Sequence, residues 1–129
     1  MSLKALLAVA LGGGIGSALR YGVNFVVIAR FGPGFPFGTF LINITGSLLI
    51  GIVAELAATS SVGMAPLLRL FLAVGVLGGY TTFSTFALDT VTLVGDRTLG
   101  MATLYVLASV ALGVVAAFAG QVLVRLAMR

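Results

Sequence analysis

The sequence predicts an all-α integral membrane protein with four transmembrane helices, and two observations lead to this class. Of its 129 residues, 60% are hydrophobic and only 8% are charged, whereas an average soluble domain is about 25% charged. The apolar residues also fall into four stretches, each long enough to supply the roughly 20 residues that cross a bilayer. We therefore expect a multi-pass protein of a cell membrane (inner or plasma).

The four spans are predicted over about 3–29, 37–58, 66–94 and 99–126. The segments between them have the composition of turns and loops, and they are Phe31–Pro36, Thr59–Gly63 and Gly95–Arg97. None of these segments is long enough to hold a second domain. Residues 1–129 are therefore expected to form a single four-span membrane domain with no soluble catalytic unit, which argues against an enzyme.

Charge and composition exclude several other classes. The formal net charge is +4, but the basic residues are scattered near helix ends and form no patch of the kind that nucleic acid needs. Contact with the headgroups of the lipid bilayer explains them, and no nucleic-acid partner is expected. Because the chain has no cysteine and no histidine, disulfides, thiol catalysis and zinc or haem ligation by those side chains are excluded.

The third apolar stretch contains the run GGYTTFSTF at 78–86. Two adjacent glycines weaken a helix, and a membrane tolerates irregular backbone only where protein or a watery cavity covers it. We therefore predict that the third helix is broken near Gly78–Thr81. Such a break leaves unpaired carbonyl groups, and inward-facing carbonyls suit a hard cation such as sodium.

Three of the predicted spans each have one polar stripe at helical spacing. The residues are Asn43, Ser47, Gly51 and Glu55 in the second span, Thr81, Thr82, Ser84 and Thr85 in the third, and Tyr105, Ser109 and Gly113 in the fourth. One interpretation is that the stripes hold the helices together by hydrogen bonds. The other is a polar pathway, which the combination of Asn43 with a helix break favours.

The chemistry of these residues favours an anion over a cation. A cation pathway usually has acidic rings, but Glu55 and Asp89 lie toward helix ends, where snorkelling to the interface would account for them. The remaining groups are hydrogen-bond donors, namely the Asn43 amide, the hydroxyls and Arg20. Arg20 has the alternative of snorkelling to the headgroups.

Phe83 and Phe86 lie beside these donors at i, i+3 spacing. A phenyl ring is negative on its face and positive at its edge, so ring edges directed at a pathway favour an anion and ring faces favour a cation. Packing against lipid or protein is the alternative for both side chains.

Orientation in the membrane is weakly specified. The side that holds both termini collects Lys4, Arg69, Arg125 and Arg129, and the other side collects Arg30 and Arg97. Because the distribution of Lys and Arg sets orientation, this small bias leaves two possibilities. Either the termini face the cytoplasm, or the chain inserts both ways and pairs antiparallel.

Three motifs together resemble one known family. They are GSALR at 16–20, GTFLIN at 38–43 and GGYTTFSTF at 78–86, and the similarity extends over essentially the whole chain. The sequence resembles the Fluc family of fluoride channels, also called the CrcB family. The family often has Phe where this chain has Tyr80.

The resemblance implies an antiparallel, dual-topology homodimer with two pores that passively export fluoride and so lower its toxic level in the cytoplasm. Phe83 and Phe86 would present ring edges to each pore, and Asn43 would donate its amide there. The polar track of the pore would contain Ser84, Thr85, Tyr105 and Ser109.

The resemblance also implies a structural sodium ion at the dimer interface that is not transported. Backbone oxygens of Gly78 and Thr81 would hold it, and Arg20 would match the arginine in the first span of the family. Two positions depart from the family pattern. Gly113 stands where some members have a further serine, and Asp89 stands where a glutamate is common, so the vestibule role of Asp89 stays open.

Two other functions suit four short spans with a weak charge bias. One is a small drug/proton antiporter, and the other is a non-transporting assembly subunit of the membrane. A proton-coupled exporter needs a membrane-embedded carboxylate, typically in its first span, and the predicted first span has none.

Overall fold

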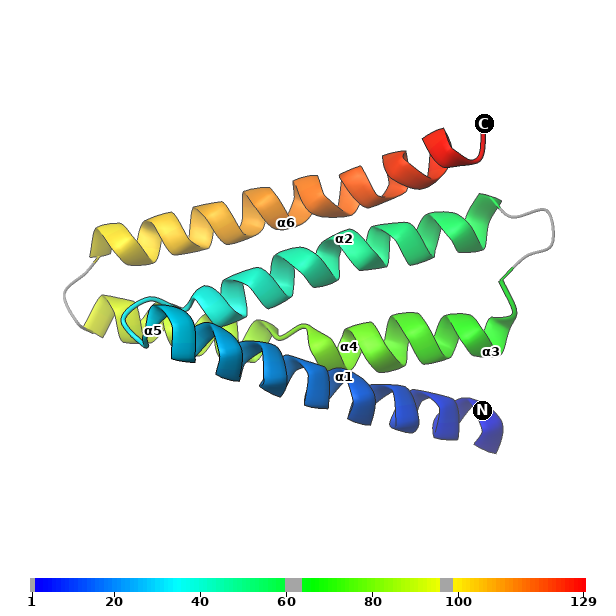
Figure 1. Ribbon diagram of the computed structural model, residues 1–129, viewed down its shortest axis with the longest axis horizontal. Helices are drawn as coiled ribbons and strands as arrows, with labels where there is room; N and C mark the ends of the chain where they lie inside the picture. The colour runs from blue at the N-terminus through cyan, green and yellow to red at the C-terminus, as the bar shows by residue number, and fades with distance from the viewer. Residues whose placement is uncertain (1, 60–63, 96–98) are drawn as a thin grey trace.

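The computed structural model describes residues 2–59, 64–95 and 99–129. Within these ranges every regular element is a helix, and four helical segments are long and apolar enough to cross a membrane (Figure 1). The predicted class, an all-helical protein with four membrane-spanning segments, is confirmed. The predicted loop residues 60–63 and 96–97 lie outside the described residues.

Three of the four segments are single helices, and the third is divided. The single helices are α1 (Leu3–Phe31), α2 (Phe37–Thr59) and α6 (Leu99–Ala127). The third segment consists of α3 (Pro66–Arg69), the π-helix η1 (Leu70–Leu77), α4 (Gly78–Tyr80) and α5 (Phe83–Gly95). The wide turns of a π-helix are rare and are frequently found at functional sites.

Local capping explains where α1 begins and ends. Ser2 Oγ accepts a hydrogen bond from the Ala5 N–H at 3.2 Å, which satisfies one free N–H group of the first turn. At the other end Gly32 has φ +77°, a left-handed conformation that glycine adopts without strain. Its N–H donates to the Ile28 carbonyl at 2.8 Å, so the chain turns sharply before α2 begins.

The helices associate as two pairs. α2 packs along α6, and α1 packs along η1 and α4, while both termini lie at the same end of the molecule (Figure 1). Glycines bring the second pair close, because a Cβ at Gly12 would lie 2.9 Å from the Gly75 Cα and one at Gly79 would lie 3.0 Å from the Gly13 Cα. In the sequence, Gly12 with Gly16 and Gly75 with Gly79 have the four-residue spacing of small residues that predicts close approach of membrane helices, and the predicted contact is present.

The α2–α6 pair combines close packing with a salt bridge. A Cβ at Gly51 or at Gly120 would collide with backbone of the facing helix. One turn beyond Gly51, Glu55 Oε1 lies 2.9 Å from Arg125 Nε, and Glu55 is only 9% exposed. The expectation that Glu55 snorkels to the interface is therefore wrong, since its carboxylate is held between the helices by Arg125.

Candidate functional site

The backbone between α4 and α5 provides the centre of the candidate site. Thr81 has φ −76° and ψ 158°, an extended conformation, and α5 resumes at Phe83. Both the N–H and the hydroxyl of Thr81 donate to the Leu77 carbonyl, at 3.0 Å and 2.9 Å. The chain thus leaves the helix after one last bonded turn, and the next peptide groups need partners from elsewhere.

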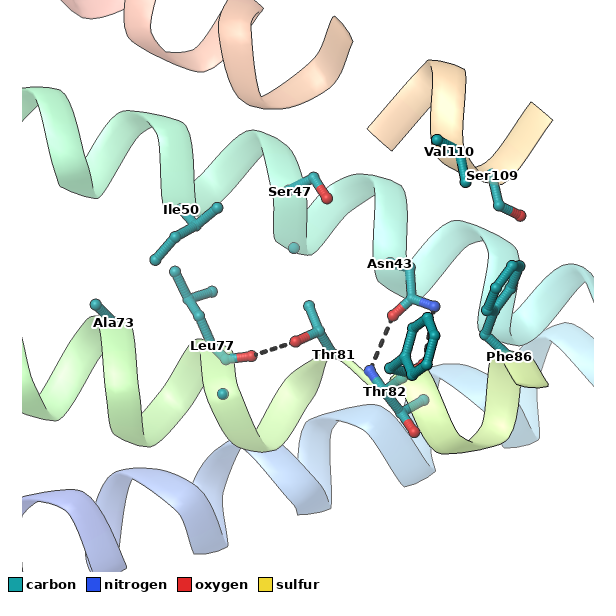
Figure 2. A pocket seen from close by; sticks show the side chains of 13 residues that line it. Asn43, Ser47, Ile50, Ala73, Leu77, Thr81, Thr82, Phe86, Ser109 and Val110 are labelled. Carbon is teal, nitrogen blue, oxygen red and sulfur yellow. Dashed lines mark hydrogen bonds between the residues drawn. The ribbon is translucent and has the colours of Figure 1, made fainter. Parts of the chain in front are cut away.

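Asn43 on α2 supplies partners for Thr82. Its Oδ1 accepts from the Thr82 N–H at 2.9 Å (Figure 2), and its Nδ2 donates to the Thr82 carbonyl at 3.1 Å. This two-point contact fixes which end of the amide is oxygen, because a backbone N–H can only donate and a carbonyl can only accept. One N–H of the amide remains for another acceptor. Asn43, which the sequence predicts as a donor in a pore, thus also holds the extended segment in place through Thr82.

The Thr82 side chain organises the start of α5. Its hydroxyl accepts from the Thr85 N–H at 3.2 Å, which is the contact of a helix N-cap. The same oxygen lies 3.0 Å from Thr85 Oγ1 and 3.3 Å from Ser84 Oγ. Three neighbouring hydroxyls therefore form one hydrogen-bonded group at the N-terminus of α5, where the helix dipole favours negative charge.

Aromatic rings extend from this group to α6. The centroids of Phe83 and Phe86 are 5.7 Å apart with planes tilted by 42°, and Phe86 lies 5.3 Å from the Tyr105 ring. Tyr105 is fully buried, and its hydroxyl donates to Asp89 Oδ2 at 3.3 Å. Phe83 is 80% exposed in the single chain, so one face of the site is open to a partner or to lipid.

These groups surround a cavity of about 380 Å³ between α2, the third segment and α6 (Figure 2). Asn43, Ser47, Gly78, Thr81, Thr82, Phe83, Phe86 and Ser109 are among its lining residues, and none of the described residues that line it is charged. The Ser109 hydroxyl is buried and has no hydrogen-bond partner among the described residues. An unpaired hydroxyl and an available amide N–H in the lining of one cavity make it suitable for an acceptor.

Comparison with known sequences gives a consistent assignment. A sequence model of the family described as "CrcB-like protein, Camphor Resistance (CrcB)" matches residues 7–121. The chain belongs to the CrcB-like family. It is 50% identical to the fluoride-specific ion channel FluC 2 of Nitrobacter hamburgensis over 119 residues, which are 92% of this chain and 95% of that protein.

Other relatives show the same degree of similarity. The chain is 48% identical to the fluoride-specific ion channel FluC of Rhizobium meliloti over 125 residues, covering 95% of this chain and 98% of the relative. It is 51% identical to the protein of that name from Methylobacterium sp. over 108 residues, covering 84% and 86%. The range 7–121 matched by the family model contains the motifs at 16–20, 38–43 and 78–86.

In this CrcB-like chain the predicted site residues fall into three groups. Asn43, Phe83, Phe86 and Ser109 line the cavity, as do the two positions predicted for sodium, Gly78 and Thr81. Ser84, Thr85 and Tyr105 do not line it but contact residues that do. Arg20 is half-buried on α1 and is not among the lining residues.

Thr85 and Asp89 instead line a second, smaller cavity of about 190 Å³ together with Asn24 and Thr39. Asp89 accepts a hydrogen bond from the Tyr105 hydroxyl, and the Tyr105 ring contacts Phe86, which lines the first cavity. Sequence reasoning missed Thr82 as a cap, although a threonine directly before the first residue of a helix, here Phe83, is a recognisable helix start.

The oxygen atoms near Gly78 and Thr81 also indicate whether a cation could bind there. The described residues contain no group of three or more acidic, histidine or cysteine side chains that could hold a metal. The oxygens that Gly78 and Thr81 can offer are their backbone carbonyls and the Thr81 hydroxyl. Gly78 is exposed, and a Cβ there would meet nothing closer than the Ala73 carbonyl at 3.8 Å. Oxygens are what a hard cation prefers, and the open surface leaves space for ligands from a second chain.

Proposed function

We propose that this chain is the subunit of a fluoride-selective channel that passively exports fluoride and keeps its cytoplasmic level low. The observation that carries the proposal is the cavity wall, which combines an amide, an unpaired hydroxyl and a phenyl pair without any charged side chain. The relatives that align over nearly the whole chain are fluoride-specific ion channels. A channel of this kind is a transporter and not an enzyme.

The mechanism follows from the size and hydration of the ion. Fluoride must leave its water shell to enter a narrow pore, so several weak donors have to replace that shell without trapping the ion. The free N–H of Asn43, the Ser109 hydroxyl and the positive edges of Phe83 and Phe86 are donors of this strength. A larger halide would not be surrounded at the same spacing.

The proposal includes an antiparallel, dual-topology homodimer. The face that carries Phe83 and Gly78 is exposed in the single chain, yet hydroxyls and irregular backbone at membrane depth need cover by protein or a water-filled cavity. A second copy would provide this cover and close the open side of each cavity. The weak distribution of basic residues is compatible with insertion in both directions.

We also propose a structural, non-transported sodium ion held by backbone oxygens of Gly78 and Thr81 from both copies. The extended conformation of Thr81 supports this part of the proposal, since it interrupts the helical hydrogen-bond ladder between α4 and α5. In this role the ion would stabilise the dimer and supply no chemistry to permeation.

The experiment is a fluoride electrode measurement on liposomes that contain the purified protein. Fluoride efflux with little chloride efflux is expected, together with loss of efflux when sodium is replaced by a larger cation on both sides. Equal fluxes of fluoride and chloride would refute the proposal. So would undiminished fluoride flux in the double variant Phe83→Ile, Asn43→Asp.

A further inference from the structure

Hydroxyl groups in the described helices differ in whether they already donate a hydrogen bond within the protein. Several threonine hydroxyls donate to the carbonyl of the preceding turn of their own helix, as serine and threonine commonly do within helices. The donors are Thr45 at 2.7 Å, Thr81 at 2.9 Å, Thr90 at 2.8 Å, Thr92 at 3.0 Å and Thr103 at 2.9 Å. In the described parts of the chain, the Ser47 and Ser109 hydroxyls have no hydrogen bond at all.

Both of these free hydroxyls line the same cavity. Ser47 lies on α2 one helical turn after Asn43, so the two side chains share a face of the helix, and Figure 2 shows them in sequence along the cavity wall. Ser109 lines the cavity from α6. A hydroxyl that bonds neither its own helix nor a neighbour is available to a molecule or ion in the cavity.

The Ser47 hydroxyl lies opposite Gly113 of α6. A Cβ at Gly113, one turn beyond Ser109 on α6, would lie 3.5 Å from Ser47 Oγ. The Ser47 hydroxyl thus lies where a short side chain from α6 would project. α6 provides no polar group at this level, and α2 provides one instead.

We propose that Ser47 donates a hydrogen bond to the permeating fluoride ion and continues the row of donors beyond Ser109, at the level where Gly113 offers none. This inference rests on the proposed function. The pathway would then alternate between α2 and α6, with Asn43 and Ser47 on one side and Ser109 on the other. Nothing in the comparisons assigns a role to Ser47.

The test compares fluoride efflux from liposomes for the wild-type protein, Ser47→Ala and a matched control. The control is Thr103→Val, which removes a hydroxyl that is bonded to Leu99 and lies outside the cavity. A hydrogen bond to a charged group is strong enough that its loss slows the step it serves by roughly tenfold or more. We expect that decrease for Ser47→Ala and wild-type flux for Thr103→Val.

A second variant separates the hydroxyl from packing. In Ser47→Ala the site beside Gly113 is vacated, so adding Gly113→Ser returns a hydroxyl to the same place from the opposite helix. The double variant is expected to recover most of the lost flux. Flux that stays low in a correctly folded double variant would overturn the assignment, because the defect would then come from packing.

The outcomes also separate a failure of the role proposed for Ser47 from a failure of the proposed channel function. Wild-type protein that passes no fluoride would refute the proposed function itself. Wild-type protein that conducts, alongside Ser47→Ala at an equal rate, would overturn the role of Ser47 alone. If Ser47→Ala elutes as an aggregate, Ser47→Cys replaces it, since a thiol is close in size but donates weakly, and the same decrease is expected.

Discussion

Replacing Asn43 with alanine tests whether one amide both supports the fold and serves the pore. The change removes two hydrogen bonds to Thr82, of 2.9 Å and 3.1 Å. Thr82 is only 8% exposed, so its N–H and carbonyl have little access to water after the substitution. Stability and fluoride flux should therefore decrease together.

The size of the stability loss follows from these two contacts. Leaving a buried donor or acceptor unsatisfied costs about 1–3 kcal/mol for each group. Cavity water beside Thr82 would offset part of this cost, and hydrogen bonds within membranes are often weaker than that range. We expect a loss of about 2–4 kcal/mol, which on the scale of soluble domains of this size lowers Tm by on the order of 10 °C.

The assay is thermal unfolding in detergent, followed by size-exclusion chromatography at each temperature. The matched control is Asn24→Ala, which removes the other asparagine within the predicted spans; no side-chain hydrogen bond is found for Asn24 in the described residues. A Tm for Asn43→Ala equal to that of wild type and of Asn24→Ala would show that the Thr82 contact does not support the fold.

Three further predictions concern packing and capping, each measured by the same unfolding assay. Arg125→Met should cost about 1–2 kcal/mol more than Glu55→Gln, because it removes the cation beside a Glu55 side chain that is only 11% exposed. The Arg125 side chain is 51% exposed and can turn to water when Glu55 is replaced; equal losses would contradict this. Gly16→Ala should destabilise the packing of α1 on η1 and α4 by about 1–3 kcal/mol, since its Cβ would collide with the Val76 carbonyl of η1 and lie 2.8 Å from the Tyr80 nitrogen of α4. Gly14→Ala, with nothing within 4 Å of its Cβ, should be neutral. Thr82→Val should cost about 1 kcal/mol through loss of the α5 cap, and Thr82→Ser should keep most of it; a valine variant as stable as the serine variant would argue against the cap.

Local patterns in the sequence were sufficient to predict the membrane-spanning helices and one contact between helices. The length of the apolar stretches predicts four membrane-spanning segments. The spacing of Gly12 and Gly16 and of Gly75 and Gly79 predicts close approach, and these glycines do meet facing backbone. Both inferences need only periodicity within one helix, which is information that a single sequence contains.

Contacts between distant helices could not be predicted in this way. Glu55 and Arg125 are 70 positions apart, and Asn43 and Thr82 are 39 apart, so nothing in the local pattern pairs them. The snorkelling expectation for Glu55 was wrong for this reason, because a helix-end carboxylate looks the same in sequence whether it reaches water or a neighbouring arginine. Likewise, no residue in Leu70–Leu77 distinguishes the π-helix from an α-helix.

The hydroxyls form a bonded group and a free group, and this division suggests how a channel can have a rigid backbone and still offer free donors to an ion. The Thr81 hydroxyl is bonded to the Leu77 carbonyl, and the Thr82 hydroxyl is bonded to the N–H of Thr85 at the start of α5. These bonds fix the extended segment beside the cavity. Ser47 and Ser109 keep their protons available on the opposite walls. A fixed frame lowers the cost of organising donors around a small anion, and donors with no competing partner need not break a bond to engage it. Because each donor is weak by itself, the ion is stabilised along the row without being held at any one position.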